Sequence, residues 1–140
     1  DPTIVESPVT LRDLAMQEFT KLRKAIRLAG QAANNATIHK TRIKTKRARY
    51  AAELAQEGDS KAIGRFIKAA TRFQDLLGVH QDAVLAERYV EAFLKYQGRR
   101  QAAFTAGLLA ARANQRREEV REEFWSEWKR LKKRGNRAWN

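Results

Sequence analysis

Basic side chains are concentrated in one stretch of this chain that has no acidic residue. Ten Lys and Arg residues, and no Asp or Glu, fall between residues 21 and 52. A solvated helix normally mixes the two signs, because opposite charges three or four positions apart stabilise it by about 0.2–0.5 kcal/mol and like charges cost as much. A segment that keeps such repulsion is typical of a surface that binds a polyanion. The alternative interpretation is a generic solubility surface.

The spacing within this stretch places several polar groups on one side of a helix. His39, Arg42, Lys46 and Tyr50 form one stripe, and Arg49 follows beside it. Ile43 and Leu54 are expected to mark an apolar side next to the stripe. Cations beside apolar surface cost free energy unless a counter-charge meets them there. Lys40 and Lys44 point away from the stripe and are expected to be solvated.

A second row of cations follows further along the chain. Lys61, Arg65, Lys68 and Arg72 are spaced four, three and four residues apart, opposite an apolar stripe. The row is roughly 16 Å long at 1.5 Å per residue. Two such rows on adjacent helices would form a groove for a linear polyanion. A solvated basic face is again the alternative.

The residues needed for catalysis or metal binding are missing from the sequence. The chain has no Cys, its serines stand only at positions 7, 60 and 126, and its two histidines, His39 and His80, lie on different segments. No nucleophile–base–orienter set, phosphate-binding glycine loop or dinucleotide fingerprint is present. Mg²⁺-dependent phosphoryl transfer needs carboxylates, which the basic segments lack. We therefore predict no catalytic residues, no metal site and no cofactor.

Glycines and apolar periodicity divide the chain into four helical segments. Gly30, Gly58 and Gly98 stand where helices are expected to end. The predicted helices span approximately residues 9–29, 37–57, 60–96 and 99–134. Their expected N-terminal caps are Ser7-Pro8 for the first, Thr37 for the second and Asp59 or Ser60 for the third.

Short linkers force antiparallel neighbours and predict an all-α, up-down four-helix bundle that forms a single domain over residues 1–140. The long third and fourth helices would extend about 20 Å beyond the others. Gly78 is expected to kink or interrupt the third helix, and the extension either folds back there or packs against something else.

The net charge of the 140 residues is +13, which favours anionic partners. No apolar stretch approaches the roughly 20 residues that span a bilayer, and no signal-peptide pattern is visible, so we expect a cytoplasmic protein without a membrane partner. The chain starts at Asp1 without a Met, as expected of a fragment of a longer protein.

Two stretches resemble the motifs of a known family. They are His39-Lys-Thr-Arg-Ile-Lys-Thr-Lys-Arg-Ala-Arg-Tyr50 and Phe73-Gln-Asp-Leu-Leu-Gly-Val-His-Gln-Asp-Ala83. Together they are similar to the CHAD domain, the conserved-histidine α-helical domain. The resemblance extends over nearly the whole chain but over only half of the usual domain, which contains two similar four-helix bundles. The chain resembles the C-terminal half, and a second four-helix bundle or a homodimer partner is therefore expected.

The resemblance implies non-catalytic binding of inorganic polyphosphate, which would direct the protein to polyphosphate or polyphosphate granules. Matched residue by residue, the candidates are His39, Arg42, Lys46, Arg47 and Arg49, and Tyr50 closes the same motif. Lys61, Arg65, Lys68 and Arg72 are added from the helical spacing alone. Sulfate or phosphate ions are expected at these positions in a crystal. Gln74, Asp75, Gln81 and Asp82 are interpreted as structural, with Asp75 a candidate ion-pair partner for a cation of the His39 segment.

Two other binding functions use the same charge. A helical nucleic-acid-binding protein would contact the phosphate backbone but should also offer stacking or base-edge groups, and Tyr50 is the only aromatic residue on the His39 stripe. A scaffold that docks an acidic protein partner is the third alternative.

Overall fold

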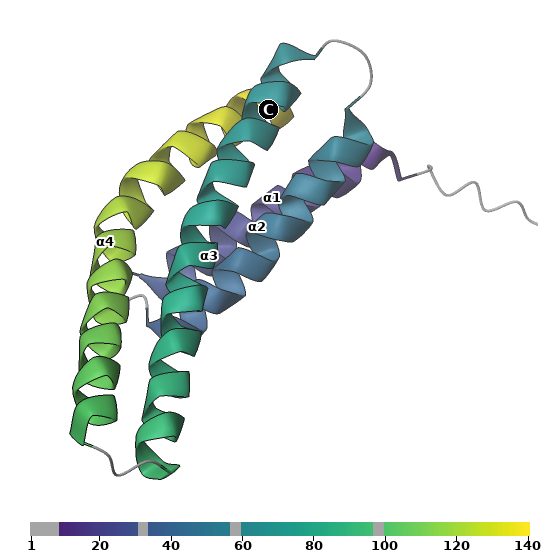
Figure 1. Ribbon diagram of the computed structural model, residues 1–140. Helices are drawn as coiled ribbons and strands as arrows, with labels where there is room; N and C mark the ends of the chain where they lie inside the picture. Colours follow the sequence, from purple (N-terminus) through teal and green to yellow (C-terminus); the bar gives the residue numbers. More distant parts are fainter. Residues whose placement is uncertain (1–8, 31–33, 57–59, 97–99) are drawn as a thin grey trace, which may run out of the picture.

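Four α-helices make up the computed structural model, which describes residues 9–30, 34–56, 60–96 and 100–140 (Figure 1). They are α1 (Leu11–Ala29), α2 (Asn35–Ala55), α3 (Lys61–Tyr96) and α4 (Arg100–Trp139). Neighbours in sequence pack on one another, and α4 also contacts α1. The described residues contain no strand. The prediction of an all-α four-helix bundle with long third and fourth helices is confirmed, since α3 and α4 have 36 and 40 residues and α1 and α2 have 19 and 21.

Polar caps fix where the helices begin. Thr10 caps α1, and its hydroxyl accepts a hydrogen bond from the Asp13 N–H while the Asp13 carboxylate accepts one from the Thr10 N–H. Asn34 caps α2 by accepting from the Thr37 N–H at 2.9 Å, so Thr37 lies in the first turn and is not the cap. The Ser60 hydroxyl accepts from the Ile63 N–H at the start of α3. The expected caps Ser7-Pro8 and Asp59 lie outside the described residues.

The glycines act differently from one another. Gly30 follows α1 with φ 60°, a backbone conformation that side chains with a Cβ disfavour. Gly78 does not interrupt α3, contrary to expectation, and Gly135 lies inside α4, which continues to Trp139 beyond its predicted end at residue 134. Gly58 and Gly98 are outside the described residues.

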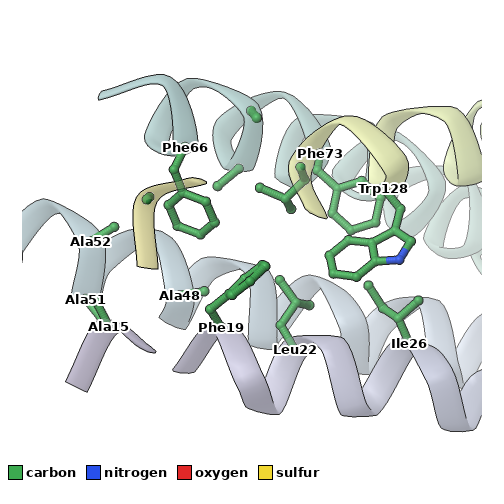
Figure 2. Packing of buried hydrophobic residues seen from close by; sticks show 14 of the residues in the cluster. Ala15, Phe19, Leu22, Ile26, Ala48, Ala51, Ala52, Phe66, Phe73 and Trp128 are labelled. Atoms are coloured by element: carbon green, nitrogen blue, oxygen red, sulfur yellow. The ribbon is translucent and has the colours of Figure 1, made fainter. Parts of the chain in front are cut away.

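Aromatic side chains from three helices form the centre of the core. Figure 2 shows Phe19 of α1, Phe66 and Phe73 of α3 and Trp128 of α4 pointing toward one another. The Phe19 and Phe66 rings meet edge to face with centroids 5.4 Å apart, and Phe73 lies 6.0 Å from Trp128. Such pairs add about 0.5–1.5 kcal/mol each to the free energy gained by burial. This packing holds α3 in the position that presents its opposite, basic face to solvent.

Apart from Ile38, small side chains form the buried face of α2. Thr41, Thr45, Ala48 and Ala52 are buried there, and the two threonine hydroxyls donate to carbonyls one turn earlier at 2.8 Å. The expectation that Ile43 and Leu54 mark the apolar side is wrong, since they are 40% and 61% exposed. Thr and Ala face the core because their small size lets α2 pack closely on its neighbours.

The far ends of α3 and α4 extend past α1 and α2, as the helix lengths predict (Figure 1). Apolar side chains along these ends have no cover within the described residues. The exposed ones are Leu85, Tyr89, Phe93, Leu94, Tyr96, Phe104, Leu108 and Leu109.

Candidate anion-binding surface

The Arg42 guanidinium lies against the backbone of α3. A Cβ placed on Gly78 would lie 3.6 Å from Arg42 Nε and 3.9 Å from Nη2, which is van der Waals contact, so the guanidinium lies directly beside the Gly78 backbone. Its Nε is buried and has no hydrogen-bond partner among the described residues. The packing fixes the direction of a half-buried cation that no carboxylate of the described chain neutralises.

Tyr50 brings two further cations of α2 together. The Arg49 guanidinium lies over its ring at 4.7 Å and the Lys46 ammonium at 5.8 Å. Cation–π contacts at exposed sites contribute about 0.5–1 kcal/mol each. Arg49 also approaches the Glu53 carboxylate, at 3.8 Å, which is beyond hydrogen-bond distance. The Tyr50 ring therefore groups these cations with little neutralisation.

The remaining sequence candidates on α2 and α3 are exposed. His39, Lys46 and Arg47 face solvent on α2. On α3 the exposed row consists of Lys61, Arg65, Lys68 and Arg72. Among the described residues, none of these cations forms an ion pair within 4 Å. Both rows thus present charge to solvent, with Phe66 and Phe73 on the buried side of α3.

The two rows are staggered and do not lie side by side. Arg42 is level with Gly78, and the Gln56 amide lies level with Gly64, where a Cβ would be 3.5 Å away. Halfway between these contacts, Arg49 is level with Thr71 to within about one turn. The rows therefore overlap only near Arg49 and Arg72. Together they form a track roughly 30 Å long, rather than a 16 Å groove with two equal walls.

The polar residues of the second motif do not neutralise this track. Asp75 is exposed and forms no ion pair within the described chain, so the expected partnership with an α2 cation is not found. The Gln74 side-chain oxygen is buried without a hydrogen-bond partner there. The contribution of this motif to the surface is instead Gly78, beside whose backbone the Arg42 guanidinium packs.

His80, the other histidine, lies apart from this surface in the contact between α3 and α4. It is fully buried, and neither ring nitrogen has a hydrogen-bond partner among the described residues. Burial, reinforced by the nearby charges of Arg121 and Arg117, lowers the pKa of His80 to about 4, although Glu87 opposes the shift. A neutral, buried imidazole of this kind is a core group. No cluster of three or more His, Asp or Glu side chains that would suit a metal occurs in the described ranges.

A second group of cations was not predicted from the sequence. Lys40 and Lys44, taken there as solvated, converge with Lys21 and Lys24 of α1 on a pocket of about 280 Å³. The signal was available in the sequence: spacings of three and four on two helices joined by a short linker place such residues opposite one another.

Comparison with known proteins supports the family resemblance. The CHAD domain model matches residues 5–91, which includes both motifs and ends within α3. The match is thus shorter than the expected resemblance over nearly the whole chain. No curated protein and no solved structure matches the chain significantly. None of the described helices combines the length and apolar character of a membrane span. With well over half of its residues matched and both motifs meeting where Arg42 packs on Gly78, the chain belongs to the CHAD domain family.

Proposed function

We propose that this protein binds inorganic polyphosphate along the staggered rows of α2 and α3, called here the α2/α3 track. The track comprises His39, Arg42, Lys46, Arg47, Arg49, Tyr50, Lys61, Arg65, Lys68 and Arg72. The CHAD domain is in general a binding domain that is associated with polyphosphate. The observation that carries the proposal is the absence of a carboxylate within hydrogen-bond distance of these cations in the described chain.

The side chains of the track suit a repeated phosphate ligand. Arg42 and Arg49 are half-buried and held in place by Gly78 and Tyr50, so little rotamer entropy remains to be lost when a guanidinium donates to phosphoryl oxygens. The exposed lysines act as mobile point charges along the chain of phosphates. Binding releases counterions and should weaken steeply with salt.

Tyr50 also favours polyphosphate over nucleic acid. It is the one aromatic side chain on the track, and its ring already contacts Arg49 and Lys46. Surfaces that bind single-stranded nucleic acid usually add free aromatic platforms on which bases stack. A row of cations at helical spacing can bind the uniform oxygens of polyphosphate without any group that stacks on bases. In this role the protein performs no chemistry on its ligand, and binding would place it on polyphosphate or polyphosphate granules in the cytoplasm.

A competition experiment tests the choice of ligand. Long-chain polyphosphate and DNA or RNA of equal charge compete for the protein in about 150 mM salt, a concentration at which weak non-specific contacts are screened. Polyphosphate is expected to displace the nucleic acid. The proposal is wrong if the nucleic acid wins.

A charge-matched pair of variants tests the site. Replacing Arg42, Lys46 and Arg49 by Gln should lower polyphosphate affinity by at least about 100-fold, since each charge-assisted hydrogen bond contributes about 1.5–3 kcal/mol. The melting temperature should stay level or rise because repulsion is relieved. The control replaces the exposed α4 residues Lys129, Arg130 and Lys133 by Gln, which removes the same charge and should change affinity less than about threefold. Equal losses in both variants would mean that only net charge matters.

The expected second helical bundle is also part of this proposal. The uncovered apolar side chains at the far ends of α3 and α4 support such a partner, either a second copy of this chain or another bundle. Monomeric proteins rarely expose large contiguous apolar patches. A partner there would extend the surface available to a long polyphosphate chain.

A further inference from the structure

The side of α2 that faces α1 carries a second concentration of unneutralised charge. A pocket of about 280 Å³ lies between the two helices and is lined by Lys21 and Lys24 of α1 and by Lys40 and Lys44 of α2. Its apolar lining comes from Ala25, Leu28 and Ala29. None of its lining residues is acidic. None of its lining residues belongs to the α2/α3 track.

Three of the four lysines have no counter-charge. Lys21 pairs with Glu18 at 3.4 Å, an exposed contact that contributes little. Lys24, Lys40 and Lys44 form no ion pair within 4 Å in the described parts of the chain. Lys44 is half-buried and lines the same pocket as the other two. Holding these cations together costs free energy that a bound anion would recover.

The donors of the pocket are the ammonium groups alone. Thr37 and Thr41 also line it, but their hydroxyls already donate to the carbonyls of Asn34 and Thr37 at 3.0 and 2.8 Å. Each ammonium offers three N–H donors and no acceptor. Such a site selects a compact ligand that has several acceptor oxygens and high negative charge. Phosphate oligomers have these properties, and a single carboxylate does not.

We propose that this α1/α2 pocket binds short inorganic phosphate oligomers of the pyrophosphate and tripolyphosphate class. The inference goes beyond the proposed function and does not rest on it, because none of the pocket residues belongs to the α2/α3 track. It gives the protein a second phosphate-binding surface, between α1 and α2. The track suits a long chain and the pocket suits a short one.

Calorimetric titration of the full chain with sodium tripolyphosphate in about 50 mM salt tests the inference. Replacing Lys24, Lys40 and Lys44 by Gln should lower the affinity for tripolyphosphate at least about tenfold. The α4 control variant, which removes the same charge, should lower it less than about threefold. Unchanged affinity in the pocket variant, or equal losses in the pocket and control variants, would overturn the inference.

A second measurement needs no substitution and therefore does not depend on how the variants fold. Acetylation of lysine amines on the wild-type protein should slow at least about fivefold at Lys24, Lys40 and Lys44 when tripolyphosphate is present, and remain unchanged at Lys129 and Lys133. Uniform protection, or none, would contradict a localised site. Affinity for long-chain polyphosphate tests the proposed function separately. If the variant of Arg42, Lys46 and Arg49 binds long-chain polyphosphate normally, the proposed function of the track is wrong, while the result for the pocket is unaffected.

Discussion

Arg42 packs over Gly78, and this contact of a guanidinium with a glycine joins the two family motifs. A Cβ on Gly78 would lie 3.6 Å from Arg42 Nε, which is ordinary van der Waals contact for one methyl group. A larger side chain would need the space that the guanidinium fills. The relationship limits the side chain at position 78 to about the size of a methyl group as long as Arg42 keeps its place.

Substitutions at Gly78 should separate helix stability from ligand binding. Gly78→Ala fits beside Arg42 and should raise the free energy of unfolding by up to about 1 kcal/mol, because Ala is the better helix former. Gly78→Leu should displace the Arg42 guanidinium and lower polyphosphate affinity about tenfold or more. Thermal melting and calorimetric titration of both variants measure the two effects. Normal affinity in Gly78→Leu would show that the position of Arg42 does not matter for binding.

Gly135 leaves room for the Phe19 ring, and a pair of glycine variants tests this role. A Cβ at Gly135 would overlap the Phe19 ring, whereas a Cβ at Gly107, in the same helix, would meet nothing within 4 Å. Gly135→Ala should therefore lower the free energy of unfolding by about 2–3 kcal/mol through overpacking. Gly107→Ala should raise it by up to about 1 kcal/mol. Thermal or urea unfolding of the two variants provides the comparison, and a stabilised Gly135→Ala would contradict the close approach of α1 to α4.

The glycines also show how far the sequence could predict the structure. The periodicity of large apolar residues such as Phe66, Phe73 and Phe124 was sufficient to predict the helices and the core residues, because burial of large side chains contributes most to the stability of the fold. Glycine was ambiguous, since the same residue ends α1 at Gly30 and permits close packing inside α4 at Gly135. Only the position of a neighbouring helix distinguishes these cases.

The candidate surface was predictable in its residues but not in its geometry. Helical spacing identified the exposed rows that begin at His39 and Lys61. It did not give the stagger between them, because the register of α2 on α3 depends on the contacts at Gly78 and Gly64. For the same reason the convergence of Lys24 with Lys40 and Lys44 was missed, since it depends on how α1 packs against α2.

His80 should make the stability of the protein depend on pH in mildly acidic solution. Its pKa is lowered from 6.5 to about 4 in the folded protein, first by burial and then by Arg121 and Arg117. The unfolded chain therefore binds the proton more tightly, and the free energy of unfolding should fall by up to about 3 kcal/mol as the pH drops from 6.5 to 4. Above pH 6.5 this contribution to stability is fully present.

Urea unfolding of the wild type and of His80→Leu across this pH range separates the effect of His80 from the titration of carboxylates. In the variant, most of the decrease in the free energy of unfolding between pH 6.5 and 4 should be absent. His39→Gln, which removes the exposed histidine and leaves His80 in place, should keep it. Parallel pH profiles for the wild type and His80→Leu would rule out a buried neutral imidazole.

The exposed apolar ends of α3 and α4 should control the association state of the protein. Tyr89 and Leu109 are 76% and 52% exposed, and both line apolar pockets between these ends. If a second copy covers this surface, light scattering at micromolar concentration should give twice the chain mass of 16.1 kDa. Replacing Tyr89 and Leu109 by Glu should then give a monomer, because buried, unpaired carboxylates are costly at an interface. Val9→Glu, at an exposed apolar position just before α1, is the matched control and should leave the dimer intact. A wild-type monomer would mean that the partner for this surface is not a second copy of this chain.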